Sequence, residues 1–139
     1  TLDAIEHKVL RALFDEPRIH FAIVCASISC PSLLSEAYEA EKLEAQLDDQ
    51  ARRFLADSGK FEIDESDKTI YLSPILDWFE EDFLDHYNLD QAITGRSKKL
   101  GAVLDFVRVH LDDVQAARLT DATYKIEYLD YDWSLNEQP

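Results

Sequence analysis

Apolar residues recur at helical spacing in the first third of the chain. Residues 3–14 are predicted to form a helix, because Asp3 suits the N-cap position and Glu6 follows it three positions later. Residues 40–57 give the clearest helical pattern, and Gly59 suits the position just after the helix. The apolar side chains on one face of this second helix are Leu43, Leu47, Ala51, Phe54 and Leu55.

Between these two helices the pattern changes to an extended one. The run RIHFAIVCA, residues 18–26, is almost continuously apolar and contains β-branched and aromatic side chains. Such a run is typical of a central strand that is covered on both faces. After an irregular stretch, Pro31 suits the first position of a helical turn. Short strands are expected at 60–63 and 69–72, joined by a polar turn.

The second half of the chain continues the alternation of helices and strands. Ser73 and Pro74 suit the first two positions of a helix that reaches about Leu84. Its aromatic residues, Trp78, Phe79 and Phe83, are expected in the core. The remaining segments are a loop or weak helix at 88–98, a helix at 100–111, and a strand at 124–131 that leads into an aromatic tail. This order predicts an α+β domain with a mixed or antiparallel sheet packed with helices.

Length and charge restrict the possible functions. The chain has 139 residues, enough for one domain with its own core. Its formal charge of −15, from 29 acidic and 14 basic residues, disfavours nucleic acid and anionic membranes as partners. No apolar run approaches the roughly 20 residues that span a bilayer, so we expect no membrane insertion. The chain lacks Met and starts at Thr1, so we expect that an N-terminal portion has been removed.

The segment HFAIVCASISCPSL contains both cysteines, at the end of the predicted strand. Cys25 could be a core residue, half of a disulfide, a metal ligand or a nucleophile, and a nucleophilic thiol needs a group nearby that favours its ionisation. His20 and Cys25 are an odd number of positions apart, so on a strand they point to opposite faces. His7 is therefore the preferred imidazole partner of Cys25. Glu6, which projects from an apolar arc, is the candidate carboxylate for orienting His7.

Each of these residues also has a purely structural interpretation. A single cysteine on a strand is more often a core residue than a nucleophile. Glu6 could simply pair with Arg11 or Arg18, and in either case we expect it to have a specific partner. Cys30 could be a helix N-cap, where the helix dipole favours the thiolate. It could instead be a resolving or disulfide partner of Cys25, or a packing residue in a turn.

Other candidate residues carry weaker signals. The four histidines are scattered and lack the paired spacing of a zinc site, so we expect neither a metal nor a cofactor; His86 and His110 are expected on the surface or at helix flanks. Backbone N–H groups in residues 26–30, which include Ser27, could bind an oxyanion. Asp130, on the acidic side of the last strand, could orient a histidine. We therefore count His20, Ser27 and Asp130 as possible lining residues of the site.

Five stretches of the chain resemble the domain-of-unknown-function 547 family. They are DAIEHKVLR, HFAIVCASISCPSL, QLDDQARRFL, IYLSPILDWFEEDF and YKIEYLDYDWSLN, and they follow the family's order. Members of that family usually carry a further portion upstream. The resemblance therefore implies that residues 1–139 are the C-terminal part of one larger domain. It also implies an α+β scaffold similar to the papain and transglutaminase thiol enzymes, and export to the periplasm or the exterior.

This resemblance leads to two main functional hypotheses. The first is a cysteine hydrolase or acyltransferase acting on peptide or amide bonds, in which Cys25 attacks, His7 transfers the proton and Glu6 orients the imidazole. The alternative is a non-catalytic module that holds a small thiol such as glutathione as a mixed disulfide, or that binds a peptide. A third, plainer interpretation is a structural portion of an exported protein. The sequence carries no signal for the oligomeric state.

Overall fold

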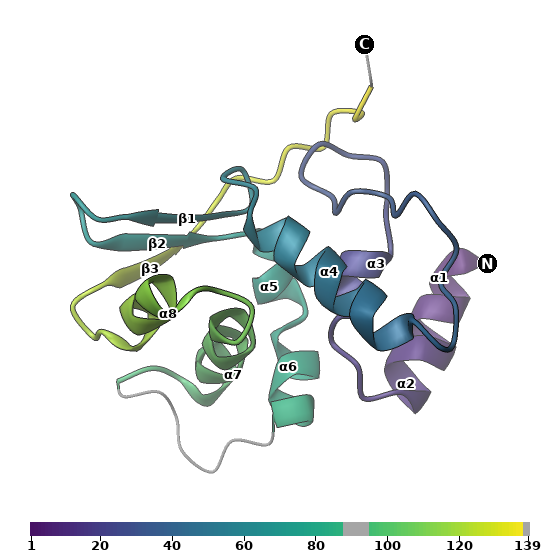
Figure 1. Cartoon of the computed structure of the whole chain (residues 1–139), viewed down its shortest axis with the longest axis horizontal. Helices are drawn as coiled ribbons and strands as arrows, with labels where there is room; N and C mark the ends of the chain where they lie inside the picture. Colours follow the sequence, from purple (N-terminus) through teal and green to yellow (C-terminus); the bar gives the residue numbers. More distant parts are fainter. Residues whose placement is uncertain (88–94, 138–139) are drawn as a thin grey trace.

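The computed structural model describes residues 1–87 and 95–137 and has an α+β architecture (Figure 1). Its small mixed sheet has the order β1-β2-β3, with β1 at Phe61–Asp64, β2 at Thr69–Leu72 and β3 at Lys125–Tyr128. β1 and β2 are antiparallel, whereas β2 and β3 are parallel. The expected α+β fold is confirmed, and of the two expected sheet types, mixed or antiparallel, the sheet is mixed.

The β1–β2 hairpin forms where the polar turn was predicted. Phe61 pairs with Leu72 and Ile63 with Ile70, which places these apolar side chains on one face of the hairpin. The Asp64 side chain accepts hydrogen bonds from the backbone N–H groups of Ser66 and Asp67, at 2.8 and 3.1 Å. These hydrogen bonds to Asp64 stabilise the turn that reverses the chain between β1 and β2.

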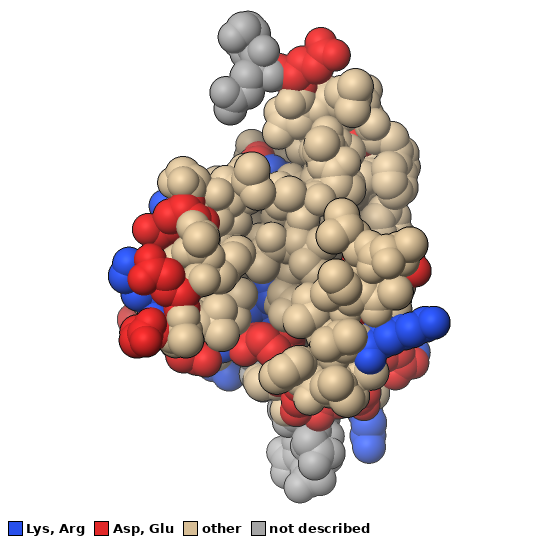
Figure 2. Space-filling model, turned by 90° about the vertical axis from the view of Figure 1, so that its right-hand side faces the viewer, with Lys and Arg blue, Asp and Glu red and all other residues tan. Residues whose placement is uncertain are grey.

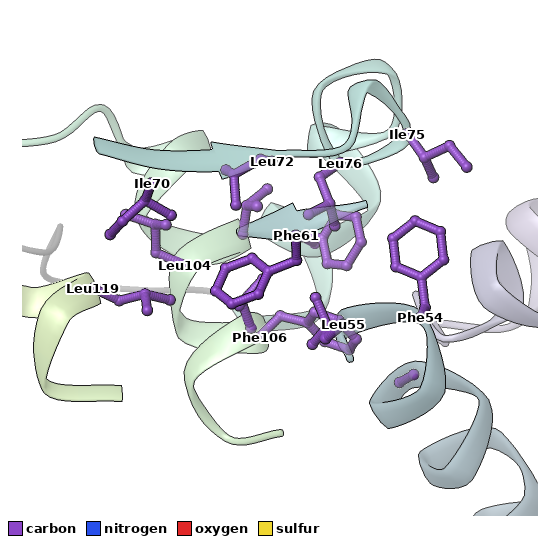
Figure 3. Close-up of a cluster of buried hydrophobic side chains, with 14 of the residues drawn as sticks. Phe54, Leu55, Phe61, Ile70, Leu72, Ile75, Leu76, Leu104, Phe106 and Leu119 are labelled. Atoms are coloured by element: carbon purple, nitrogen blue, oxygen red, sulfur yellow. The ribbon is translucent and has the colours of Figure 1, made fainter. Parts of the chain in front are cut away.

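Helices pack against the sheet and complete the core (Figure 1). These are α4 (Leu43–Leu55), α5 (Pro74–Trp78), α6 (Glu80–Tyr87), α7 (Lys98–Arg108) and α8 (Asp113–Thr120). Ser73 caps α5 through a hydrogen bond from the N–H of Ile75, with Pro74 at the first helical position, as predicted. Apolar side chains from the sheet and from these helices meet in one cluster, which includes Phe61, Ile70 and Leu72 of the strands and Phe106 and Leu119 of the helices (Figure 3).

The N-terminal segment is helical but only partly covered. It consists of α1 (Leu2–Ile5), a π-helical turn (Glu6–Leu10) and α2 (Arg11–Leu13). Leu2 is 85% exposed and Leu13 71% exposed, although both belong to the apolar positions of the segment. Figure 2, which shows the side of the molecule on which α1 and α2 lie, has a broad uncharged centre with acidic side chains gathered toward its edges.

The predicted strand at 18–26 is wrong. Residues Ile19–Ala22 form a single helical turn, α3, and the chain then runs extended to Cys25 without joining the sheet. A short apolar run cannot be distinguished from a buried helical turn by periodicity alone. In a sheet, a neighbouring strand would donate hydrogen bonds to the carbonyls of this segment. Here the buried side-chain amide of Gln50, on α4, donates to the carbonyls of Phe21 and Ser32.

Several smaller differences separate prediction and structure. No helical turn starts at Pro31, α8 was not predicted, and β3 ends at Tyr128 rather than at residue 131. The predicted helix from Ser73 to Leu84 divides into α5 and α6 at Phe79, whose backbone leaves the helical region. Most of the predicted loop at 88–98 lies outside the described residues. Within the described ranges, every helix is too short or too polar to cross a bilayer.

Candidate functional site

A cleft of about 530 Å³ brings together segments from both ends of the chain. It is bounded by the N-terminal helix, the segment from His20 to Pro31, helix α5 and the tail after β3. Its lining includes both thiols and two imidazoles, from Cys25, Cys30, His7 and His20. Two carboxylates and a largely apolar wall complete the lining, from Asp3, Glu6, Ile23, Val24, Pro31, Ile75, Trp78, Phe79, Tyr131 and Trp133.

Cys25 is exposed at the point where the chain turns sharply. The next residue, Ala26, has a φ of 62°, a left-handed conformation that is uncommon for a residue with a Cβ. The backbone N–H of Cys25 donates to Cys30 Sγ at 2.8 Å. The turn therefore holds the Cys25 side chain at the cleft surface while fixing Cys30 beside it.

The sulfur of Cys25 is surrounded by hydrogen-bond donors. It lies 3.2 Å from the hydroxyl oxygen of Ser27 and 3.5 Å from that of Tyr131, and these two hydroxyls are 3.0 Å apart. Partial burial opposes ionisation. Hydrogen bonds from the thiol of Cys30, from Ser27 and from Tyr131 outweigh it and lower the pKa of Cys25 to about 7. A substantial fraction of Cys25 is therefore thiolate near neutral pH.

Cys30 has the opposite character. It is only 5% exposed, and burial together with its contact to Cys25 raises the pKa of its thiol. It does not begin a helix, so the predicted role as an N-cap is wrong. Both cysteines are free thiols. The pair thus consists of an exposed, acidic thiol and a buried, weakly acidic one.

His20 is fixed by a carboxylate that the sequence analysis did not identify. Its side chain is only 2% exposed, and Nε2 lies 2.8 Å from Oδ2 of Asp82 on α6. Asp82 in turn accepts two hydrogen bonds from the guanidinium of Arg11, at 2.6 and 2.9 Å. The imidazole stacks on Phe79 with ring centres 3.9 Å apart. Burial lowers the pKa of His20 despite the neighbouring carboxylate, so the ring is neutral at neutral pH.

His7 and Glu6 line the same cleft but lie at its edge. Nδ1 of His7 is 2.9 Å from the guanidinium of Arg11, and Nε2 is 3.5 Å from the carboxylate of Asp3. The side chain of Glu6 forms no hydrogen bond or ion pair with a described residue, so the expected specific partner is not found; Arg11 pairs with Asp82 instead. Neither imidazole hydrogen-bonds the sulfur of Cys25 within the described ranges.

The predicted oxyanion site is narrower than residues 26–30. The N–H of Ile28 donates to Ser134 O and that of Ser29 to Asp132 O, while the N–H of Cys30 donates to Ser27 O. Among the described residues, the N–H groups of Ala26 and Ser27 have no backbone acceptor. The N–H of Ser27 stabilises the Cys25 thiolate, which leaves that of Ala26.

Aromatic rings from α5 and the tail form one wall of the cleft. Trp78 lies 4.9 Å from Tyr131 and 5.8 Å from Trp133, measured between ring centres. Trp78 is 48% exposed and Trp133 68% exposed. The expectation that Trp78 is a core residue is therefore wrong, whereas Phe83 is fully buried as expected.

The remaining candidates lie elsewhere. Asp130 is exposed after the end of β3 and is not among the residues lining the cleft. His86 contacts the carbonyl of Asp15. His110 lies at a helix flank, just after the end of α7, and its buried side chain contacts the carbonyl of Phe106. Among the described residues, no cluster of three or more His, Cys, Asp or Glu side chains is arranged to hold a metal ion.

Asp82 and Tyr131 are the functional candidates that sequence reasoning missed. Asp82 lies within the helix predicted from Ser73 to about Leu84, and nothing in the spacing of its neighbours marks it as a site residue. Alternation along the tail places Tyr131 on the same side as Leu129 and Trp133, opposite Asp130. Neither pattern carries a signal for contact with residues 20–25, because that contact arises from tertiary folding.

Comparison with known proteins finds one family that matches part of the chain. The family described as "Protein of unknown function, DUF547" matches residues 1–55, which include both thiols, His7 and His20. No curated protein and no solved structure matches the chain. Over residues 1–55, the chain is therefore similar to the DUF547 family of proteins of unknown function.

Proposed function

We propose that the cleft is a thiol-nucleophile site, in which Cys25 attacks the carbonyl carbon of a peptide or amide substrate. The proposed reaction is hydrolysis or acyl transfer, as in papain- and transglutaminase-like enzymes. The observation that carries this proposal is the exposed sulfur of Cys25, whose pKa is lowered to about 7 by hydrogen bonds from neighbouring thiol and hydroxyl groups. An ionised, accessible thiol is the requirement for covalent catalysis by cysteine.

His20 is the better-arranged imidazole for the proton transfer. With Nε2 donating to Asp82, the lone pair lies on Nδ1, and this nitrogen has no hydrogen-bond partner in the described part of the chain. A carboxylate that fixes the tautomer of a neutral imidazole is the arrangement that general base catalysis requires. In His7, by contrast, both ring nitrogens face other side chains. His20 would protonate the leaving amine, and Asp82 would orient it.

The lining of the cleft favours a particular kind of substrate. Exposed rings of Trp78 and Trp133 suit an apolar or aromatic group near the scissile bond. Two carboxylates, from Asp3 and Glu6, lie on the lining, and no Lys or Arg is among the lining residues. These features support a neutral or cationic peptide rather than an acidic one.

Two measurements test whether the thiol of Cys25 is ionised near neutral pH. The rate of alkylation by iodoacetamide should rise with a midpoint near pH 7, because the thiolate reacts and the pKa of Cys25 is about 7. Tyr131→Phe removes only the hydroxyl near the sulfur, so its midpoint should move to higher pH while the rate at high pH is retained. A wild-type midpoint near the ordinary value of about 8.5 would contradict the proposal.

A second experiment determines whether His20 or His7 transfers the proton. With p-nitrophenyl acetate as an activated acyl donor, the wild type should release nitrophenolate in a burst followed by turnover. His20→Gln should keep the burst but accumulate the acetylated Cys25, which intact mass detects. His7→Ala is the matched variant and should turn over normally. Loss of turnover in His7→Ala alone would assign the role to His7, and absence of any acetyl-enzyme would remove the acyl-transfer proposal.

The alternative function is reversible binding of a small thiol, such as glutathione, through a mixed disulfide to Cys25. The exposure of the sulfur in a cleft of about 530 Å³ favours it, because a small thiol fits that volume. Intact mass after incubation with oxidised glutathione would detect an adduct that reductant removes. A stable adduct together with failed acyl transfer would favour this binding role.

A further inference from the structure

The two thiols of the cleft differ in access but lie in contact. The Cys30 sulfur accepts a hydrogen bond from the backbone N–H of Cys25 at 2.8 Å, so it lies against the residue that carries the reactive sulfur. Cys25 is exposed to the cleft, whereas Cys30 is buried. A small oxidant therefore reaches Cys25 first.

The turn between the two cysteines keeps them together. The N–H of Cys30 donates to Ser27 O at 3.1 Å, and Ala26 adopts the left-handed conformation that reverses the chain. The tail adds further restraint, since Ile28 N–H donates to Ser134 O and Asp132 N–H donates to the hydroxyl of Ser29. With both ends of a short loop fixed, a reaction between the two sulfurs has little entropy left to lose.

We infer that Cys25 and Cys30 form a peroxide-responsive pair, in which Cys30 captures oxidised Cys25 as an intramolecular disulfide. This inference shares the reactive sulfur of the proposed function but does not depend on acyl transfer. Disulfide formation would switch the nucleophile off reversibly. It would also protect Cys25 from the irreversible steps of thiol oxidation.

The chemistry balances with hydrogen peroxide as the oxidant. The Cys25 thiolate attacks one peroxide oxygen, a sulfur–oxygen bond forms, the oxygen–oxygen bond breaks, and the departing hydroxide takes a proton from solvent. Cys30 then loses its proton and attacks the Cys25 sulfur; a sulfur–sulfur bond forms and the hydroxyl leaves as water. The sulfurs lose two electrons in total, the peroxide gains two, and two water molecules result.

Mass spectrometry of the peroxide-treated protein tests the inference. Both cysteines lie in the single tryptic peptide 19–42, because no Lys or Arg occurs between Arg18 and Lys42. After denaturing alkylation, the wild-type peptide should be about 2 Da lighter than its reduced form and carry no alkyl group. Reductant should restore two alkylation sites. A wild-type peptide with oxygenated Cys25 and alkylated Cys30 would overturn the inference.

Two variants locate the roles of the thiols. Cys30→Ser should accumulate the sulfenic acid of Cys25, trapped by dimedone, and proceed to the sulfinic acid. Cys25→Ser should leave Cys30 reduced under the same peroxide exposure. Oxidation of Cys30 in that variant at the wild-type rate would contradict the assigned order. The wild-type peptide decides the inference even if a variant fails to fold. Failure here with an alkylation midpoint near pH 7 would remove the redox pair and leave the nucleophile intact.

Discussion

At the scale of single residues, His20 shows how burial sets a protonation state. Its ring is enclosed by Phe79 and by the ion pair of Arg11 with Asp82. Burial and the positive charge of Arg11 disfavour the imidazolium, while Asp82 and the more distant charge of Glu6 favour it; burial is the largest effect, so the pKa falls. A neutral ring that donates from Nε2 is the form that leaves Nδ1 as an acceptor.

This environment predicts that acid destabilises the protein through His20. The unfolded chain binds a proton at His20 below about pH 6.5, whereas the folded chain binds it only at lower pH, so the unfolded state gains protons first. The free energy of unfolding should therefore fall as pH drops below 6.5, by at most about 1.4 kcal/mol per pH unit from this group. Urea unfolding between pH 5 and pH 8 measures this slope.

His20→Gln is the control for that slope, since a glutamine amide can still donate to Asp82 but does not titrate. The variant should show a flatter dependence between pH 6.5 and pH 5. An unchanged slope would mean that other groups dominate acid destabilisation.

At the scale of elements, the predictions succeeded where local rules decide the structure. The Ser73–Pro74 cap, the helix at 43–55 and the hairpin at 61–72 follow from capping, periodicity and turn chemistry. The prediction of a strand at 18–26 was wrong because a short, buried apolar segment can form a helical turn as well as a strand. That error changed the site, since the opposite-face argument separating His20 from Cys25 applies only to a strand.

The side chain of Gln50 links α4 to the segment that carries the two cysteines. Its amide donates to the carbonyls of Phe21 and Ser32, on either side of the turn, at 3.2 and 2.7 Å. Gln50→Leu keeps the volume but removes both donors, so we expect a loss of about 1–3 kcal/mol in the free energy of unfolding. Removing Oε1, which is buried without a partner among the described residues, moderates the loss. Alkylation of Cys30 should also become faster, because the turn is less restrained.

Arg53→Ala is the matched control on the same helix. Arg53 forms an exposed ion pair with Asp49, so its loss should change the free energy of unfolding by less than about 1 kcal/mol. Chemical denaturation of the two variants gives the comparison. Equal destabilisation by both changes would mean that Gln50 acts through helix stability and not through the cysteine turn.

At the scale of the whole molecule, the site depends on contacts between the matched family segment and the rest of the chain. Residues 1–55 supply the thiols and imidazoles. Asp82, which fixes His20, comes from α6, and Tyr131, which contacts Cys25, comes from the tail. After β3 the tail crosses to the cysteine turn, where Ile28 and Ser29 donate to the carbonyls of Ser134 and Asp132 (Figure 1). The acidity of Cys25 is therefore a property of the assembled fold.

Ending the chain after Leu129 tests this dependence. Among the described residues after Leu129, Tyr131 is the one that packs against the core, so the truncated protein should keep its helical circular dichroism. Cys25 should lose the hydroxyl of Tyr131, and its turn should lose the backbone partners at Asp132 and Ser134, which raises the pKa of its thiol. The iodoacetamide midpoint should therefore shift upward by more than in Tyr131→Phe, because that variant keeps the backbone contacts. Equal shifts in the two proteins would assign the whole effect to the hydroxyl, and an unchanged midpoint in the truncated protein would show that the turn holds Cys25 without the tail.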